Sequence, residues 1–142
     1  MAKRLNDSID VKLAVANSVT STTIVATKVN TTGYGRARFI FTLGGVAGIG
    51  AVGTDGPKIW KASTSGGTYT SIASAVLGAI TSGAISAGGA VAVIDVPTDS
   101  ANPWLQVSGA LTSSSMYHSA VVELYGGINR PPTSSANQIV TV

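Results

Sequence analysis

The chain has 142 residues, of which 44% are hydrophobic and only 11% charged, and this composition excludes an intrinsically disordered protein. It contains no cysteine and a single histidine, which excludes disulfides and metal sites built on thiolates. The formal net charge of +3 comes from basic residues scattered along the chain, whereas nucleic-acid binders concentrate such charge, so we expect no nucleic-acid partner.

Residues 62–94 carry no charge, and this segment is long enough to cross a membrane. Glycine, serine and threonine interrupt it throughout, so we expect strands and a turn there and no membrane span. The first eight residues, MAKRLNDS, lack the apolar core of a signal peptide.

Alternation of apolar and polar residues, or a high content of β-branched residues, predicts short strands at 11–15, 20–29 and 36–43. Asn17 and Ser18 should end the first of these. The third strand should turn one face to the core, and that face consists of Ala37, Phe39, Phe41 and Leu43.

Residues 58–72 carry the clearest structural signal in the chain. Two β-prone runs, 58–62 and 68–72, flank the turn sequence Ser-Thr-Ser-Gly-Gly. Gly66 and Gly67 lack a side chain and can take a positive φ, which tight turns between antiparallel strands require. The segment is therefore predicted to be a β-hairpin.

Residues 75–81 and 90–96 are interpreted as another pair of strands, joined by small residues. Turn-forming residues at 97–103 separate this pair from two further strands, at 104–111 and 116–125. Eight or nine short strands of this kind indicate an all-β fold, an antiparallel β-sandwich that is jelly-roll-like.

We expect one folded domain, the sandwich, over residues 10–127, with an N-terminal arm at 1–9 and an extended C-terminal arm at 128–142. The last five residues, QIVTV, favour a strand again. They would either add to a sheet edge of a neighbouring molecule or form a frayed tail, and the sequence leaves both interpretations open.

Residues 48–53 match the dinucleotide-binding pattern G-x-G-x-x-G. That motif needs a helix beginning at its glycines, because the pyrophosphate lies on the helix N-terminus. Here residues 54–57, Thr-Asp-Gly-Pro, follow at once and prevent a helix. We therefore interpret the stretch as a loop, and we expect no cofactor.

The titratable residues form no catalytic pattern. His118 lies within a predicted strand among apolar residues, with no cysteine to complete a metal site. Asp95 and Asp99 flank Pro97 and could approach each other as paired carboxylates do in glycoside hydrolases, but acids in such a cluster are more often turn formers. We expect Glu123 to pair with an arginine or lysine of a neighbouring strand, and we expect no enzyme.

Six short segments follow one another in an order that resembles a known family. They are GYGRARF (33–39), KIWKAS (58–63), GGTYTSI (66–72), VIDV (93–96), PWLQV (103–107) and AVVELYG (120–126). Together they resemble small β-sandwich proteins encoded among the head genes of tailed bacteriophages, the capsid decoration or cement proteins. The resemblance spans residues 10–132 and lies in the pattern of strands and turns.

The resemblance implies a structural virion protein, made in the host cytoplasm, that binds the outer surface of an icosahedral capsid. Its partner would be the major capsid protein, whose neighbouring subunits it would cement against the pressure of the packaged DNA. It would act as a homo-oligomer, a dimer or a trimer at a capsid symmetry axis. The candidate contact residues are basic, aromatic or apolar: Lys3, Arg4, Trp60, Trp104, Arg130, Ile139, Val140 and Val142. For the two tryptophans, packing in the core is an equally good interpretation.

A carbohydrate-binding β-sandwich, which would attach to glycans of a host surface, is the alternative. The pattern Ser-x-x-Gly-Gly-x-Tyr at residues 63–69 is similar to hairpins of discoidin-like and other sugar-binding modules. Such sites present exposed aromatic rings or calcium-binding carboxylates, and this chain has 6% aromatic residues and six acids. Glycan binding is therefore the less favoured function.

Overall fold

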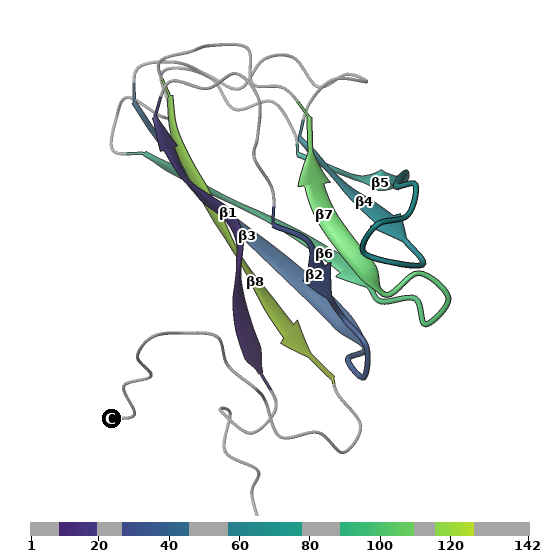
Figure 1. The fold of residues 1–142 in the computed structure, drawn as a ribbon. Coiled ribbons are helices and arrows are strands. Elements are labelled where there is room, and N and C mark those ends of the chain that lie inside the picture. Colours follow the sequence, from purple (N-terminus) through teal and green to yellow (C-terminus); the bar gives the residue numbers. More distant parts are fainter. Residues whose placement is uncertain (1–8, 20–26, 46–56, 78–88, 110–115, 127–142) are drawn as a thin grey trace, which may run out of the picture.

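The computed structural model describes residues 9–19, 27–45, 57–77, 89–109 and 116–126 (Figure 1). These ranges contain no helix long and apolar enough to cross a membrane. They form eight strands: β1 (Asp10–Val19), β2 (Val29–Asn30), β3 (Arg36–Gly45), β4 (Lys58–Ala62), β5 (Thr70–Val76), β6 (Ala90–Pro97), β7 (Trp104–Ser108) and β8 (Met116–Tyr125).

The strands form two antiparallel sheets of four, in the orders β1-β8-β3-β6 and β2-β7-β4-β5. β1 pairs with β8, β2 with β7, β3 with β6 and β4 with β5, so the chain resembles one long antiparallel ribbon folded over on itself. This is the strand order of a jelly roll. The prediction of an all-β, jelly-roll-like sandwich is confirmed.

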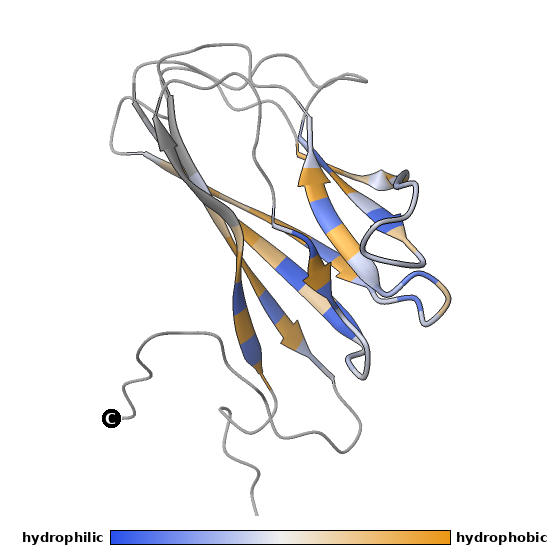
Figure 2. Ribbon diagram, viewed as in Figure 1, coloured by the Kyte–Doolittle hydropathy of each residue, from blue (hydrophilic) through white to orange (hydrophobic). Residues whose placement is uncertain are grey.

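The core lies between the two sheets, and its residues recur with the period of two that a strand requires. Figure 2 shows this alternation as bands of colour along β7. The four residues of β3 predicted to face the core are all buried. The larger core residues are Val29, Phe39, Phe41, Leu43, Ile59, Leu77, Ile94, Val96, Leu105, Val107, Val122 and Leu124.

β1 is longer than predicted, because it continues through Asn17 and Ser18 to Val19. The register of the β1–β8 ladder shifts on both sides of Val15, so that some residues of β1 have no partner residue in β8. Of the strand predicted at 20–29, residues 20–26 lie outside the described residues, and only Val29 of the remainder is in a strand, β2.

The prediction that 75–81 pairs with 90–96 is wrong. Residues 70–76 form one strand, β5, which pairs with β4 in one sheet. Residues 90–97 form β6 in the other sheet, where they pair with β3. A hydrophobic alternation marks a strand but carries no information about its partner, so adjacency along the chain does not predict the pairing.

β4 and β5 form the predicted hairpin, although its second strand begins at Thr70 rather than residue 68. The positive φ expected at Gly66 and Gly67 is not found. Because residues 63–69 all belong to the connection, the chain reverses without the left-handed conformation that a two-residue turn needs. The described glycines with positive φ are Gly33, Gly89, Gly109 and Gly126.

The last two predicted strands are found as β7, which ends at Ser108, and as β8, which has the predicted bounds. Residues 1–8 and 127–142, which make up almost all of both predicted arms, lie outside the described residues. The loop predicted at 48–53 also lies outside them. The arms and this loop therefore stay predictions.

Candidate functional site

Four aliphatic residues form a row across all four strands of the β1-β8-β3-β6 sheet. Leu13 lies opposite Val121, and Val121 lies opposite Ile40. Ile40 in turn lies opposite Val93. Residues opposite each other in neighbouring strands point to the same face, and the chain neighbour Phe39 points into the core, so the row lies on the outer face. We call these four residues the aliphatic stripe.

The aliphatic stripe is accessible to solvent. The exposed fractions are 50% for Leu13, 54% for Val93 and 37% for Val121. Val91, the next outward position of β6, is 68% exposed and widens the stripe at that edge. Single exposed aliphatic residues are normal on protein surfaces, but a contiguous row across a sheet is typical of an interaction site.

A row of charged residues borders the stripe, one outward position further along β8, β3 and β6, while the corresponding position of β1 is Val11. Arg38 lies between Glu123 and Asp95, and it forms ion pairs of 3.6 Å with each of them. The pairing predicted for Glu123 is thus confirmed. We call Glu123, Arg38 and Asp95 the charged row. Exposed ion pairs contribute about 0–1 kcal/mol each, so the row matters chiefly as a pattern of charge.

Asp95 is the best connected residue of the charged row. It accepts hydrogen bonds from Nε of Arg36 at 3.0 Å and from the hydroxyl of Tyr125. Burial raises the pKa of Asp95, but the bonds from Tyr125 and Arg36, together with the charges of Arg36 and Arg38, lower it below its ordinary value. The carboxylate therefore stays charged and is held in place by its neighbours.

The two tryptophans lie on the outer face of the other sheet. Ile59 and Val107 are opposite each other and buried in the core, so the neighbouring positions Trp60 and Trp104 point away from it. Trp60 lies opposite Gln106, two residues from Trp104, which makes the tryptophans diagonal neighbours. Neither belongs to the core cluster. Core packing is therefore wrong for both, and their contact with a partner stays a prediction.

The Trp104 side chain also borders a groove of about 430 Å³ between β1 and β2, the edge strands of the two sheets. Lys12, Leu13, Lys28 and Asn30 are among the other residues that line it. Each ammonium group has a partner within the protein, Asp10 for Lys12 and the carbonyl of Ser65 for Lys28. An aromatic ring, a side-chain amide and two lysines that already have partners therefore line the groove.

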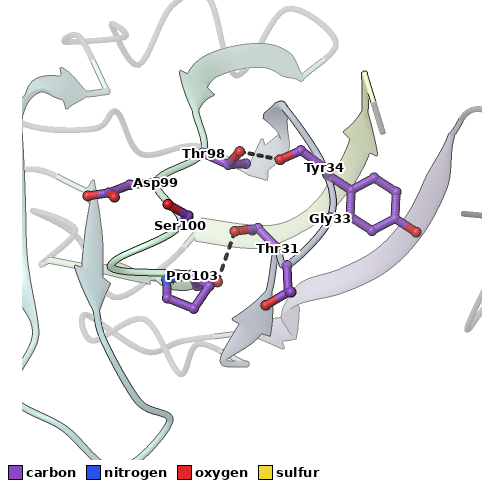
Figure 3. A pocket seen from close by; sticks show the side chains of 8 residues that line it. Thr31, Gly33, Tyr34, Thr98, Asp99, Ser100 and Pro103 are labelled. Carbon is purple, nitrogen blue, oxygen red and sulfur yellow. Dashed lines mark hydrogen bonds between the residues drawn. The ribbon is translucent and has the colours of Figure 1, made fainter. Parts of the chain in front are cut away.

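A polar pocket of about 270 Å³ lies between the turn at 31–34 and the turn at 98–103 (Figure 3). The hydroxyl of Thr31 donates to the carbonyl of Pro103 at 2.9 Å, and the hydroxyl of Thr98 donates to the carbonyl of Tyr34. These hydroxyl groups hold the two turns together, and so do two backbone hydrogen bonds across the same gap. The pocket is therefore lined by groups that serve the fold.

Asp99 is the one acid among the residues that line this pocket. Its carboxylate accepts hydrogen bonds from the side chains of Asn102 and Lys61 and from the backbone N–H of Ala101. These three bonds, with Asn102 the largest, lower the pKa of Asp99 to about 2. Asp99 thus acts as a turn former, as predicted.

Replacing Asp99 with asparagine is expected to remove an acid-sensitive part of the stability. Because the pKa of Asp99 is lower in the folded protein than its ordinary value of 3.8, the charged form stabilises the fold above pH 3.8. That contribution is lost as the pH falls through about 2. We expect wild type to melt at a higher temperature than Asp99→Asn at pH 5, and we expect this difference in melting temperature to shrink as the pH falls toward 2. A difference in melting temperature that does not change with pH would contradict the lowered pKa of Asp99.

The sequence-based hypothesis of a carboxylate pair is not supported, because Asp95 and Asp99 have separate partners and stand in different elements. His118 lies in β8 opposite Leu43, within the backbone ladder. Among the described residues, no group of three or more histidines, aspartates or glutamates is placed to hold a metal ion. Of the predicted contact residues, Lys3, Arg4, Arg130, Ile139, Val140 and Val142 lie outside the described residues.

The sequence analysis missed the aliphatic stripe. Its four residues belong to four strands, at positions 13, 40, 93 and 121, and none is unusual within its own strand. The one available signal was Val91 and Val93, which make residues 90–96 apolar at both odd and even positions. In comparisons with known proteins, no protein-family model matches this chain and no curated protein matches its sequence.

Proposed function

We propose that this protein is a structural component of a tailed-bacteriophage head, which binds the outer surface of the capsid and holds neighbouring major capsid protein subunits together. It would be made in the host cytoplasm and act on the assembled shell without catalysis. The resemblance of residues 10–132 to capsid decoration proteins directs the proposal to this class. The exposed apolar side chains of the sandwich support one part of the proposal, namely that the protein binds other molecules.

The observation that carries the proposal is that both outer faces of the sandwich present apolar side chains. One face has the aliphatic stripe, and the other has Trp60 and Trp104. A protein that joins other molecules needs at least two contact surfaces, whereas a protein with one ligand needs one. Copies that each touch two molecules of an array gain effective concentration, so individual contacts need not be strong.

We assign the tryptophan face to the capsid. Large aromatic residues dominate the energy of many interfaces, and truncating such a residue commonly weakens binding tenfold or more. Among the described atoms, Nε1 of Trp60 is buried and has no hydrogen-bond partner, so a carbonyl of a partner could accept from it after a small side-chain movement.

The test is co-sedimentation of the purified protein with empty, expanded heads of the phage that encodes it. We expect saturable binding that Trp104→Ala weakens at least about tenfold. Ser71→Ala is the matched control, since Ser71 lies opposite Trp60 in β5 and has a small side chain. Thermal melting confirms that both variants are folded. Absence of binding by wild type at saturating concentration would refute the proposal.

Glycan binding is the second candidate, and the groove beside Trp104 favours it. An aromatic ring next to the Asn30 amide is a combination that ligand sites use for polar molecules with apolar patches. A glycan array separates the two functions. Retention of one glycan class by wild type and not by Trp104→Ala, without binding to heads, would replace the capsid proposal with this one.

A further inference from the structure

The geometry points to the aliphatic stripe as the contact between two copies of this chain, which pack face to face through their β1-β8-β3-β6 sheets. The capsid proposal counts the same stripe as one of its two contact surfaces, and a dimer formed through the stripe would keep two contact surfaces, one tryptophan face from each copy. The test is separate, because it concerns the protein alone in solution. The inference follows from three features of this face, namely the stripe, the charged row beside it and the area that the sheet offers.

A two-fold axis in the plane of the interface, parallel to the strands and midway between β8 and β3, matches the stripe with itself. The rotation places β8 of one copy over β3 of the other, and β1 over β6. Val121 then lies against the partner's Ile40, and Leu13 against the partner's Val93. Apolar residues meet apolar residues along the whole stripe, at the spacing of about 10 Å of packed sheets.

The same axis also matches the charges. Glu123 and Arg38 are opposite each other in β8 and β3, so the rotation places Glu123 over the partner's Arg38 and Arg38 over the partner's Glu123. The axis lies midway between these residues, so the small rotation between packed sheets displaces them little. Asp95 lies over the partner's Val11, because Val11 is the residue of β1 opposite Glu123, and it keeps its partners Arg36 and Arg38 within its own chain. The face therefore complements itself in apolarity and, at Glu123 and Arg38, in charge.

The other symmetric arrangement fails this criterion. An axis that runs along the stripe would place the charged row over the row of Ser119, Thr42 and Val91. Arg38 and Glu123 would then face the hydroxyl groups of Thr42 and Ser119, and Asp95 would face the aliphatic Val91, which leaves all three charges without opposite partners. The axis parallel to the strands thus places Arg38 and Glu123 over opposite charges, whereas the axis along the stripe does so for none of the three charged residues.

The area of the face predicts the strength of the contact. Four strands at about 4.8 Å spacing are about 19 Å wide, and the six steps from Arg36 to Thr42 span about 20 Å. The flat footprint is about 400 Å² for each copy, or about 800 Å² in total, which is below the roughly 1,200–2,000 Å² of stable specific interfaces and within the range of weak, transient ones. We therefore expect a weak, reversible dimer that dissociates on dilution.

The first experiment measures the oligomeric state of the full chain by analytical ultracentrifugation at about 1–200 μM. We expect a dimer in wild type and a dissociation constant at least about 100-fold higher for Val93→Glu, because that carboxylate would be buried against Leu13 of the partner subunit. Ser71→Glu is the matched control, since Ser71 is an exposed residue of β5, the edge strand of the other sheet, and it should dimerise as wild type does. A monomeric wild type, or an unchanged Val93→Glu dimer, would overturn the inference.

The second experiment uses the charged row and gives a signal that only the proposed axis predicts. In the proposed dimer, residue 38 of each copy lies over residue 123 of the partner subunit. Arg38→Glu would therefore bring two glutamates together at each of these contacts, and Glu123→Arg would bring two arginines together. Each variant alone should be largely monomeric. When the two variants are mixed, every such contact joins opposite charges, so a heterodimer should form. No heterodimer on mixing would exclude this axis.

Two other occupants of the stripe are outcomes of the same measurements. A chain without residues 128–142 that dimerises while wild type stays monomeric would show that the C-terminal segment covers the stripe. A Val93→Glu variant that keeps the dimer and loses binding to phage heads would show that the stripe faces the capsid. Either result would overturn the inference, and the second would leave the capsid proposal intact.

Discussion

Replacing Phe39 with alanine is expected to lower the free energy of unfolding by about 3–5 kcal/mol. Phe39 is fully buried in β3, between Val122 of β8 and Ile94 of β6, and it is the largest of the fully buried side chains. Alanine would leave a cavity that the strands on either side cannot close, because their backbones are fixed by the ladders. The loss is a large part of the 5–15 kcal/mol that stabilises an ordinary domain.

The adjacent residue provides the control for this prediction. Ile40 lies on the opposite face of the same strand and belongs to the aliphatic stripe. We expect Ile40→Ala to cost about 1 kcal/mol of stability, since this side chain is only partly buried, and to weaken the dimer. Urea unfolding at a concentration where both proteins are monomeric measures the first effect. Equal losses of stability for the two variants would contradict the assignment of faces.

Replacing Gly89 with alanine is expected to destabilise the protein by about 1–3 kcal/mol. Gly89 has a φ of 86°, a conformation that residues with a Cβ rarely adopt. A Cβ at this position would also lie 2.9 Å from the carbonyl oxygen of Leu43. Leu43 pairs with Ala90, the first residue of β6, so the strain would act on the beginning of the β3–β6 ladder.

Gly66→Ala is the matched control for Gly89→Ala. Gly66 lies in the β4–β5 connection without positive φ, and no atom lies within 4 Å of a Cβ built there. Its replacement should be neutral or slightly stabilising, because alanine restricts the unfolded chain more than glycine does. Thermal and urea unfolding compare the two variants. If Gly66→Ala proved as harmful as Gly89→Ala, the strain at Gly89 would not be the cause.

The predictions that succeeded rest on local patterns. The core face of β3 and the bounds of β8 follow from an alternation that is visible within ten residues. The turn-forming role of Asp99 follows from the residues beside it. In each case the interaction that decides the structure lies within a few positions of the residue, and the sequence displays it directly.

The predictions that failed concern partners far away in the chain. Residues 75–81 and 90–96 have the composition of strands, yet the described part of the first belongs to one sheet and the second to the other. The tryptophans could be assigned to the core or to a surface with equal reason. Their position followed only from the register of β4 against β7, which brings Ile59 opposite Val107.

The amino-acid sequence by itself determined that this chain forms strands, which side of most strands is buried, and that thiolate chemistry is absent, because the chain has no cysteine. Only the tertiary structure decided which strands are neighbours and therefore which residues share a row. The aliphatic stripe and the charged row exist because β1, β8, β3 and β6 are aligned in one register. Buried and exposed residues alternate along a strand, so the sequence of one strand is enough to show its buried face. A surface that crosses four strands depends instead on contacts between residues up to about 110 positions apart.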